Sequence, residues 1–438
     1  MLTYLLITSI VVIVVLRFVR FYIKFYKNKQ VLQRAPAPPE RFFLGHFNVF
    51  TNNPDRYKLF ISSISLTFAD HIFARIRLFS KKYYPIYRFS TPYITIANCL
   101  EPNDIELVLS STKHLSKSKI YTILTPAFHF TILQQLLNIF NEETSKLVDK
   151  LLEKNGKIID VVPPITNITL QSIAETAMGL DNINESTQRN YKDAIYKIGA
   201  IFLKCLSKPW YRMDAVYSWS KLAKEESAIV KVLHDFSNYI IKEREKEMSS
   251  ESHVGTYSKK KRLAMLDLLL SAKNDGADID YEGIREEVDT FMFEGHDTTS
   301  MTISFLLQDI QAKVSKYASE DFTTKTGYDI PEGTVLHIHI FGVHRNKTLY
   351  PDHLKFDPDR FLPENVNARH PFAYIPFNAG PRHCIGQKFA LLELKAALCG
   401  ILRKFKLEKV DDMFEVEFRP DLVLRPKKDI KVKILTRL

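Results

Sequence analysis

The hydrophobic pattern separates one apolar N-terminal stretch from a long amphipathic body. Residues 2–16 are almost wholly apolar, and Arg17 and Arg20 follow at once. With residues 18–22 added, the stretch reaches a length that can cross a bilayer as a helix. A cleaved signal peptide would need basic residues before the apolar run and a small-residue cleavage site after it, and neither is present. We therefore predict a membrane anchor with its basic flank over residues 1–29, and a body on the cytosolic side.

Behind the anchor, residues 30–40 form a proline-rich linker, in which the three prolines of residues 35–39 predict a stiff, extended segment. Residues 84–97 alternate between apolar and polar positions around a turn, which predicts two strands. Residues 131–153 and 225–246 show the helical period. Residues 249–262 are polar and end in four basic residues. They predict a solvated surface loop, with docking to a membrane or partner as the alternative.

Composition fits a folded protein with one large core. The 438 residues are 45% hydrophobic and 25% charged, with no internal repeat, so we predict one domain over residues 41–438. The net charge of +11 comes from scattered residues without a nucleic-acid-binding module, so we expect no nucleic acid partner. An anionic bilayer or an acidic redox partner explains the charge. The four cysteines lie far apart with no CxxC pair, which argues against a zinc site and a disulfide scaffold and favours a reducing compartment.

One cysteine stands out by its surroundings. Residues 377–390 read FNAGPRHCIGQKFA and place Cys384 between two glycines, just before a helical run. A helix N-terminus and the nearby Arg382 both favour a thiolate, which is the form that ligates metals. Gly380 and Gly386 allow the backbone to fold closely around the sulfur. The alternative is an ordinary buried thiol at the start of a helix.

A second candidate site lies inside a predicted helix. Residues 288–307 are apolar at both ends and polar in the middle, where Glu294, Gly295, His296, Asp297, Thr298 and Thr299 follow one another. Such residues weaken a buried helix unless a ligand or water uses them. The alternative is a capped or kinked helix whose threonines bond back to the preceding turn.

The first motif resembles the proximal haem loop of the cytochrome P-450 monooxygenases, and five positions carry that resemblance: Phe377, Gly380, Arg382, Cys384 and Gly386. It implies the fold of that family, mostly α with small β-sheets, in which haem b lies between a distal and a proximal helix. It also implies that Cys384 is the axial iron ligand, which donates electron density for O–O cleavage. Arg382 would pair with a haem propionate, and Phe377 would pack on the proximal face.

The second motif resembles the distal oxygen-activation motif of the same family. The resemblance implies that Asp297 and Thr298 form an acid–alcohol pair that relays protons, and that Gly295 makes room for dioxygen. Glu294 stands where most relatives have a small residue, as in the family 4 branch of fatty-acid omega-hydroxylases. In that branch the glutamate can become ester-linked to a haem methyl, so we expect Glu294 to contact the cofactor.

A third stretch, residues 349–365, is similar to the arginine-bearing meander of the family through Phe356, Pro358, Arg360 and Phe361. The resemblance is interrupted twice, near residues 119–124 and 312–327. The first interruption removes a helix that holds a propionate in relatives. The second removes the Glu-x-x-Arg helix that normally pairs with the meander arginine, so we expect Arg360 to lack its usual partners.

The resemblance implies a monooxygenase of the endoplasmic reticulum membrane that acts on a lipophilic substrate, a fatty acid or terpenoid-like lipid. Electrons would come from NADPH through a flavoprotein reductase, with cytochrome b5 as a second candidate donor. Lys388 and Lys395 would help to receive the reductase. The alternative is a catalytically silent, membrane-anchored relative without the Glu-x-x-Arg helix. With the body in the cytosol, the sequons at Asn167, Asn184 and Asn346 should carry no glycan.

Overall fold

The structure is a computed structural model, and the chain forms two compact units, each built from separated stretches. Unit 1 comprises residues 1–63, 71–116 and 311–384, and unit 2 comprises residues 64–70, 117–310 and 385–438. The described residues are 12, 15–16, 19–20, 22–23, 26–38, 75–90, 95–111, 130–208, 211, 214–253, 264–306, 314–317, 320–353, 355, 357–410, 418–419 and 421–437. The single domain predicted for residues 41–438 remains a prediction.

Unit 1 is built around a four-stranded sheet in the order β1-β2-β7-β4. Its strands are β1 (Ile86–Ser90), β2 (Thr95–Cys99), β7 (Val335–Ile338) and β4 (Val314–Tyr317). The pair β1/β2 is antiparallel, β2/β7 is parallel, and β7/β4 is antiparallel. The predicted pair of strands within residues 84–97 is confirmed, with β2 extending two residues further.

Short elements surround this sheet. They are η1 (Leu32–Arg34), α4 (Pro102–Ser110), β5 (Phe322–Thr323), β6 (Asp329–Ile330), α13 (Ile340–Val343), η5 (Pro358–Phe361), α14 (Pro363–Asn367), η6 (Pro371–Ala373) and η7 (Gly380–Arg382). The core of unit 1 joins the sheet to α4, since Ile86, Leu109 and Leu336 are all fully buried in one cluster. Almost every residue of β1, β2 and β7 is buried, which indicates that both faces of these strands are covered.

The described part of the linker belongs to unit 1, is helical through Arg34, and then packs against the sheet. Ala35 is buried and extended, as predicted for this proline-rich segment. The Pro36 carbonyl accepts a hydrogen bond of 3.0 Å from the Arg88 N–H of β1. This contact fixes residues 35–36 against the sheet.

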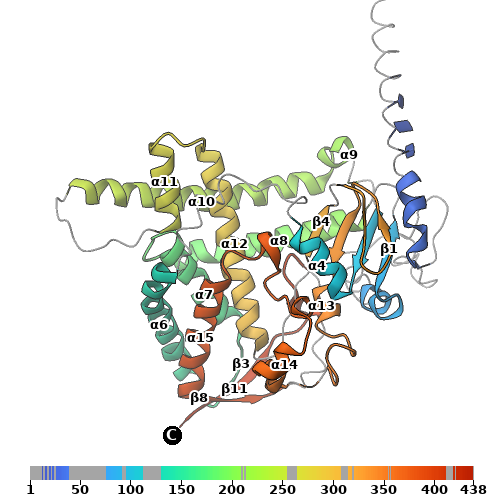
Figure 1. The fold of residues 1–438 in the computed structure, drawn as a ribbon. Helices are drawn as coiled ribbons and strands as arrows, with labels where there is room; N and C mark the ends of the chain where they lie inside the picture. The colour runs from blue at the N-terminus through green and yellow to red at the C-terminus, as the bar shows by residue number, and fades with distance from the viewer. Residues whose placement is uncertain are drawn as a thin grey trace, which may run out of the picture. The chain divides into compact units, whose positions relative to one another are not determined.

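Unit 2 is helical, with small sheets at one end (Figure 1). Its helices are α6 (Phe130–Leu152), α7 (Val162–Ala177), α8 (Glu185–Ser207), α9 (Asp214–Ser218), α10 (Lys221–His253), α11 (Met265–Asn274), α12 (Tyr281–Leu306) and α15 (Gln387–Lys404). The strands β3 (Ile158–Asp160), β11 (Lys431–Thr436) and β8 (Phe405–Lys409) form one sheet, and β9 (Phe418–Arg419) pairs with β10 (Arg425–Pro426).

Four helices, α6, α7, α12 and α15, pack together as the centre of unit 2 (Figure 1). The Phe140 ring of α6 meets the Phe389 ring of α15 edge to face, with centroids 5.0 Å apart. Where α7 meets α12, a Cβ added at Gly295 would lie 2.7 Å from Ile173, so the glycine permits close approach of the two helices. These contacts hold α12 against the core along one side.

The helical predictions are largely confirmed. Helix α6 matches the predicted residues 131–153 to within one residue at each end, and α10 contains all of 225–246. The loop prediction is wrong for residues 249–253, because α10 continues to His253. A polar sequence without an apolar period can extend an exposed helix whose earlier turns are already anchored.

Among the described residues, no helix combines the length and apolar character needed to cross a bilayer. Much of the predicted anchor, the first predicted gap at residues 119–124 and the meander residue Phe356 lie outside the described residues.

Candidate functional site

Residues 377–384 of unit 1 form a loop, called the proximal loop below, that is stabilised by hydrogen bonds within its own backbone. The Cys384 N–H donates to the Phe377 carbonyl at 2.9 Å, and the His383 N–H donates to the Gly380 carbonyl at 3.0 Å. Gly380 has a φ of +72°, and an added Cβ would lie 2.0 Å from the Leu109 carbonyl oxygen at the end of α4. Only glycine fits this position, because both the backbone conformation and the contact exclude a side chain. The glycine thereby fixes the loop that carries Cys384.

Cys384 itself is exposed, and Gly386, the N-cap of α15, follows two residues later. The sequence alternative of an ordinary buried thiol is therefore wrong for this structure. The backbone of Arg382 lies in η7, while its side chain is outside the described part of the chain. An exposed thiol at the start of an 18-residue helix fits a thiolate ligand, because the helix N-terminus favours negative charge.

The distal residues lie in α12 of unit 2. Glu294 and Thr298 are exposed and one turn apart, so they lie on the same face of the helix. The Thr298 hydroxyl donates to the Glu294 carbonyl at 2.5 Å, and the Thr302 hydroxyl donates to the Thr298 carbonyl at 2.7 Å. Both threonines bond back to the preceding turn, as the sequence alternative proposed. They form a row of hydroxyl groups along the exposed face, where a ligand can reach them.

Asp297 points away from this face. Its carboxylate accepts two hydrogen bonds from the Arg425 guanidinium, at 3.0 and 2.9 Å, and its side chain is only 2% exposed. Arg425 also donates to Asp421 at 2.8 Å and lies over the Tyr196 ring. Asp297 and Thr298 are therefore adjacent in sequence but engaged on different sides of α12.

His296 and Glu294, which precede Asp297 in α12, have distinct environments. His296 is fully buried, and one of its ring nitrogens lies 2.5 Å from the Met292 carbonyl. Burial lowers the pKa of His296, which favours the neutral ring. The Thr169 hydroxyl of α7 donates to the His296 carbonyl at 3.1 Å. Burial raises the pKa of Glu294, although part of its side chain reaches solvent. Glu294 thus lies in a partly apolar environment.

Sequence reasoning missed two charged residues of unit 2. Arg425 carried no local signal, since its partner Asp297 is 128 residues away. Glu393 of α15 is buried, and burial raises its pKa. The Ser172 hydroxyl lowers the pKa in part, and the net value is about 8. A readable signal existed for Glu393, because helical spacing places it one turn from the buried Phe389 and one turn from the buried Ala397.

In the meander of unit 1, Arg360 is bound mainly by backbone. Its guanidinium donates to the Pro351 carbonyl at 2.6 Å and to the Asp352 carbonyl at 2.9 Å. Among the side chains that the structure describes, its ion-pair partner is Asp357, at 3.9 Å. Arg360 is therefore satisfied locally, by a different set of groups from the one that the family resemblance implies.

The structure thus groups the predicted site residues in two sets. The proximal loop of unit 1 brings together Phe377, Gly380, the Arg382 backbone and Cys384. Unit 2 contains Glu294, Gly295, Asp297 and Thr298 on α12, and Gly386 at the start of α15.

Comparison with known proteins places this chain in one family. The family model described as Cytochrome P450 matches residues 117–313 and 307–434. Cytochrome P450 4c3 of Drosophila melanogaster is 33% identical over 494 residues, covering 93% of this chain and 90% of that protein. Human Cytochrome P450 4V2 is 33% identical over 427 residues, covering 79% of this chain and 81% of that protein. The solved haem domain of cytochrome P450DA is 19% identical, with a TM-score of 0.69 over 92% of this chain and 98% of the other.

The comparisons also bear on the predicted interruptions. The alignment with Cytochrome P450 4c3 runs over 494 positions, which exceeds the 438 residues of this chain, so that relative contains residues without a counterpart here. The family match breaks into two parts that meet at residues 307–313, between the end of α12 and the start of β4. This break adjoins the interruption predicted for residues 312–327.

Proposed function

This chain belongs to the cytochrome P450 family of monooxygenases, and from that premise we propose that it hydroxylates a C–H bond of a lipophilic substrate, a fatty acid or terpenoid-like lipid. The observation that supports this proposal most directly is the glycine-bound loop that presents an exposed Cys384 at the start of α15. The family 4 relatives, each about one-third identical, support the lipid substrate class. Electrons would come from NADPH through a flavoprotein reductase, with cytochrome b5 as a second donor.

We assign haem binding to residues of the two sequence motifs. Cys384 would supply the axial thiolate, and Gly380 and Gly386 would let the backbone pass close to it. Phe377 would pack on the proximal face, and Arg382 would pair with a propionate. Glu294 would face the cofactor from α12, whereas the space that the sequence assigned to dioxygen beside Gly295 is occupied by Ile173 of α7. When bound, haem supplies the oxygen chemistry, and the thiolate donates the electron density that this chemistry requires.

Thr298 and Asp297 would carry out proton transfer. The Thr298 hydroxyl has one hydrogen to donate and two lone pairs to accept with, so it can exchange its bond to the Glu294 carbonyl for one to a ligand or water. The Asp297 carboxylate is bound by Arg425, so it would have to rotate away from this guanidinium before it could contact a water beside Thr298. Proton delivery would thus be limited by the opening of a buried ion pair.

Glu294 has a separate role in this proposal, an ester bond from its carboxylate to a haem methyl. The Glu294 carboxylate would replace one methyl hydrogen, which would leave as a proton with the loss of two electrons, and dioxygen would be the oxidant. The partly apolar surroundings of Glu294 favour such a contact, because they weaken solvation of the carboxylate. Acid–acetone extraction should leave haem on the intact chain and release it from Glu294→Ala. Complete release from the intact chain would argue against the ester.

We further propose that the N-terminal stretch anchors the enzyme in the endoplasmic reticulum membrane, with the catalytic body in the cytosol. The described side chains of this stretch support that location, because Val12, Val15, Leu16 and Val19 are all more than 40% exposed. Such exposed apolar residues find a favourable environment in lipid.

The decisive experiment is the reduced carbon-monoxide difference spectrum of the whole chain expressed in microsomes. A red-shifted Soret band that disappears in Cys384→Ser would support a haem held by this thiolate, and lipid hydroxylation assays would follow. No band from well-expressed chain, or only the blue-shifted form, would favour the catalytically silent alternative. The same red-shifted band in the Cys384→Ser variant would contradict the assignment of Cys384 as the ligand. Thr298→Ala provides a folding control, because it leaves the thiolate site intact.

A further inference from the structure

Glu393 of α15 is a buried carboxyl group that has no role in the proposed chemistry. The residue is 3% exposed, and among the residues that the structure describes neither of its carboxyl oxygens has a hydrogen-bond partner. A carboxylate without a partner is costly to bury, so such a group keeps its proton. The packing around Glu393 therefore depends on one proton.

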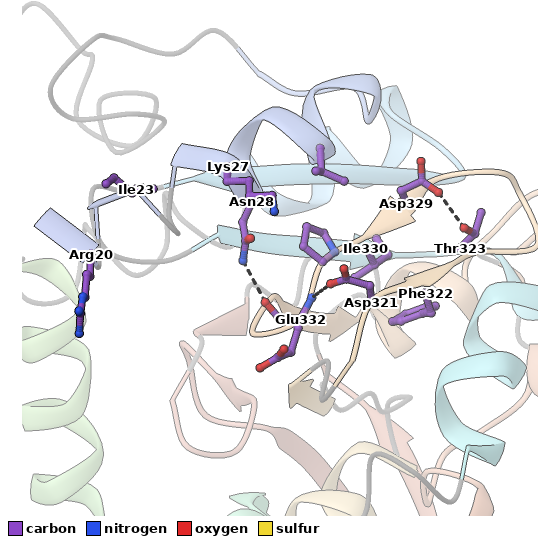
Figure 2. A pocket seen from close by; sticks show the side chains of 12 residues that line it. Arg20, Ile23, Lys27, Asn28, Asp321, Phe322, Thr323, Asp329, Ile330 and Glu332 are labelled. Atoms are coloured by element: carbon purple, nitrogen blue, oxygen red, sulfur yellow. Dashed lines mark hydrogen bonds between the residues drawn. The ribbon is translucent and has the colours of Figure 1, made fainter. Parts of the chain in front are cut away.

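Two carboxylates beside the β5/β6 hairpin of unit 1 show the opposite case. The Asp321 carboxylate accepts the Glu332 N–H at 2.6 Å (Figure 2). The Asp329 carboxylate accepts the Thr323 hydroxyl at 2.7 Å in the same view. Both groups reach solvent and have a donor, so they can stay ionised. Glu393 has no solvent and no such hydrogen bond, so its ionised form is disfavoured.

The apolar surroundings of Glu393 join α15 to α7. Phe389 and Ala396 of α15 belong to the same buried cluster as Ile173 of α7. Within this cluster, the polar neighbour of Glu393 is the Ser172 hydroxyl of α7. The hydroxyl lowers the pKa of Glu393, but burial raises it by more, to about 8. Ionisation would thus introduce a charge into the contact between two helices.

Helix α7 also contacts the middle of α12. Ile173 packs there, since an added Cβ at Gly295 would lie 2.7 Å from its side chain. One turn earlier in α7, the Thr169 hydroxyl donates to the His296 carbonyl at 3.1 Å. Both contacts fall within one helical turn of Thr298. A shift of α7 would therefore move the part of α12 that carries the Thr298 hydroxyl.

The proton of Glu393 is controlled by packing rather than by a neighbouring charge. The titratable groups on the four packed helices include Lys395 on α15, Glu143 and Lys146 on α6, Glu175 on α7, and His296 and Asp297 on α12. Glu143 and Asp297 are each bonded to a cation of their own. In the described part of the chain, burial and the Ser172 hydroxyl are the two influences on the pKa of Glu393.

We propose that the proton on Glu393 controls the contact between α15 and α7 and, through α7, the position of the middle of α12. Glu393 is then a positioning residue, because it acts on Thr298 through other residues. When α15 and α7 separate, water reaches the carboxyl group and the proton leaves to solvent. The functional part of this inference rests on the proposed role of Thr298, whereas the contact itself is a property of the folded chain.

The direction of the pH effect follows from the two states of this contact. With the contact closed, Glu393 keeps its proton up to about pH 8. With the contact open, the carboxyl group ionises above its ordinary pKa of 4.5. The closed contact is therefore most stable below pH 4.5, and opening becomes easier by about tenfold for each pH unit until it levels off near pH 8.

Hydrogen exchange of the whole chain, followed by mass spectrometry on peptides from each helix, measures this opening. The unaltered chain and Glu393→Gln are compared with each other at about pH 5.5 and again at about pH 7.5, so that the intrinsic pH dependence of exchange cancels. Peptides from α7, α15 and the middle of α12 should exchange faster in the unaltered chain, by a ratio that grows at least about tenfold between the two pH values. Glu393→Met repeats the test with an apolar side chain that does not ionise.

The exposed Glu364→Gln is the matched control and should exchange like the unaltered chain at both pH values. A Glu393→Gln ratio that does not change with pH would overturn the proposal, because the carboxyl group would then act by its shape alone. An equal growth of the ratio in α10 would also overturn it, since unit 2 would then be opening as a whole, and an unchanged α12 would refute the link to Thr298. Exchange is measured on the chain with or without haem, so a missing Soret band would contradict the proposed function and leave this test intact.

Discussion

Asp297 and Arg425 form a buried, bidentate ion pair across 128 residues of sequence, with N–O distances of 3.0 and 2.9 Å. Arg425 is shared with Asp421, whose side chain is 5% exposed. One guanidinium therefore neutralises two buried carboxylates, which ties the β10 strand and the preceding turn to the middle of α12. The proposed proton-relay residue is thus also part of the framework of unit 2.

Removing this guanidinium should destabilise unit 2 strongly. Arg425→Met leaves two carboxylates without their cation, and breaking a buried pair in this way typically costs about 3–5 kcal/mol. Arg425→Lys should recover only part of the loss, because an ammonium cannot make the same forked contact. Chemical unfolding followed by circular dichroism measures the free energy of unfolding of each variant.

As the control, Lys221→Met breaks an exposed pair with Glu225 and should cost less than about 1 kcal/mol. Equal costs for Arg425→Met and Lys221→Met would show that the buried pair is not stabilising.

The contrast between α6 and this ion pair shows what the sequence could predict. Helix α6 was predicted to within one residue at each end, because its apolar period is local and continuous. Helix α12 begins seven residues before the predicted Val288, since its first turns are polar and are stabilised by Asp280, whose side chain accepts the Gly283 N–H at 2.8 Å. The partner of Asp297 could not be predicted, because only tertiary packing brings Arg425 beside it.

The same reasoning applies to the proximal loop. The sequence predicted that Gly380 and Gly386 flank Cys384, and the motif alone was enough to select the cysteine. It could not predict that Gly380 packs against the Leu109 carbonyl of α4, because that contact joins segments far apart in the chain. The motif thus located the candidate ligand, and the structure explains how its loop is held.

Gly380→Ala should therefore lower stability by more than the backbone conformation alone explains. Alanine at a φ of +72° costs roughly 1–2 kcal/mol, and the added Cβ would also meet the Leu109 oxygen at 2.0 Å. Gly327→Ala is the matched control, because Gly327 has a φ of +86° and no heavy atom within 4 Å of an added Cβ. Unfolding free energies of the two variants isolate the contact. The interpretation fails if Gly380→Ala and Gly327→Ala lose the same stability.

Glu393 should make the stability of the chain depend on pH. Burial raises its pKa from 4.5 to about 8 in the folded state, so the folded protein holds a proton that the unfolded chain releases above pH 4.5. The contribution of Glu393 to stability is therefore full below pH 4.5, falls as the pH rises, and levels off above about pH 8. The total loss across this window is several kcal/mol, at most about 5.

Replacing Glu393 with glutamine should remove this dependence, since the amide does not ionise. At pH 8, Glu393→Gln should be more stable than the unaltered chain by a few kcal/mol, and at pH 4.5 the two should differ little. Urea unfolding at both values measures this. The exposed Glu364→Gln should show no such gain at pH 8, and a Glu393→Gln effect that is equal at both values would rule out the titration of this carboxyl as the cause.

The exposed lysines of α15 provide the last prediction, on the docking of the reductase. Lys388 and Lys395 are both exposed on the helix that follows Cys384, so an acidic partner can contact them. Reversing both charges should raise the apparent KM for the reductase about fivefold or more, because complementary charges mainly govern encounter and orientation. The kcat at saturating reductase should change little, since neither lysine belongs to the proposed haem contacts.

The double reversal Lys221→Glu/Lys224→Glu on α10 makes the same change in net charge elsewhere in unit 2 and controls for a general electrostatic effect. An unchanged KM in the α15 variant, or an equal rise in the α10 variant, would place the docking surface elsewhere.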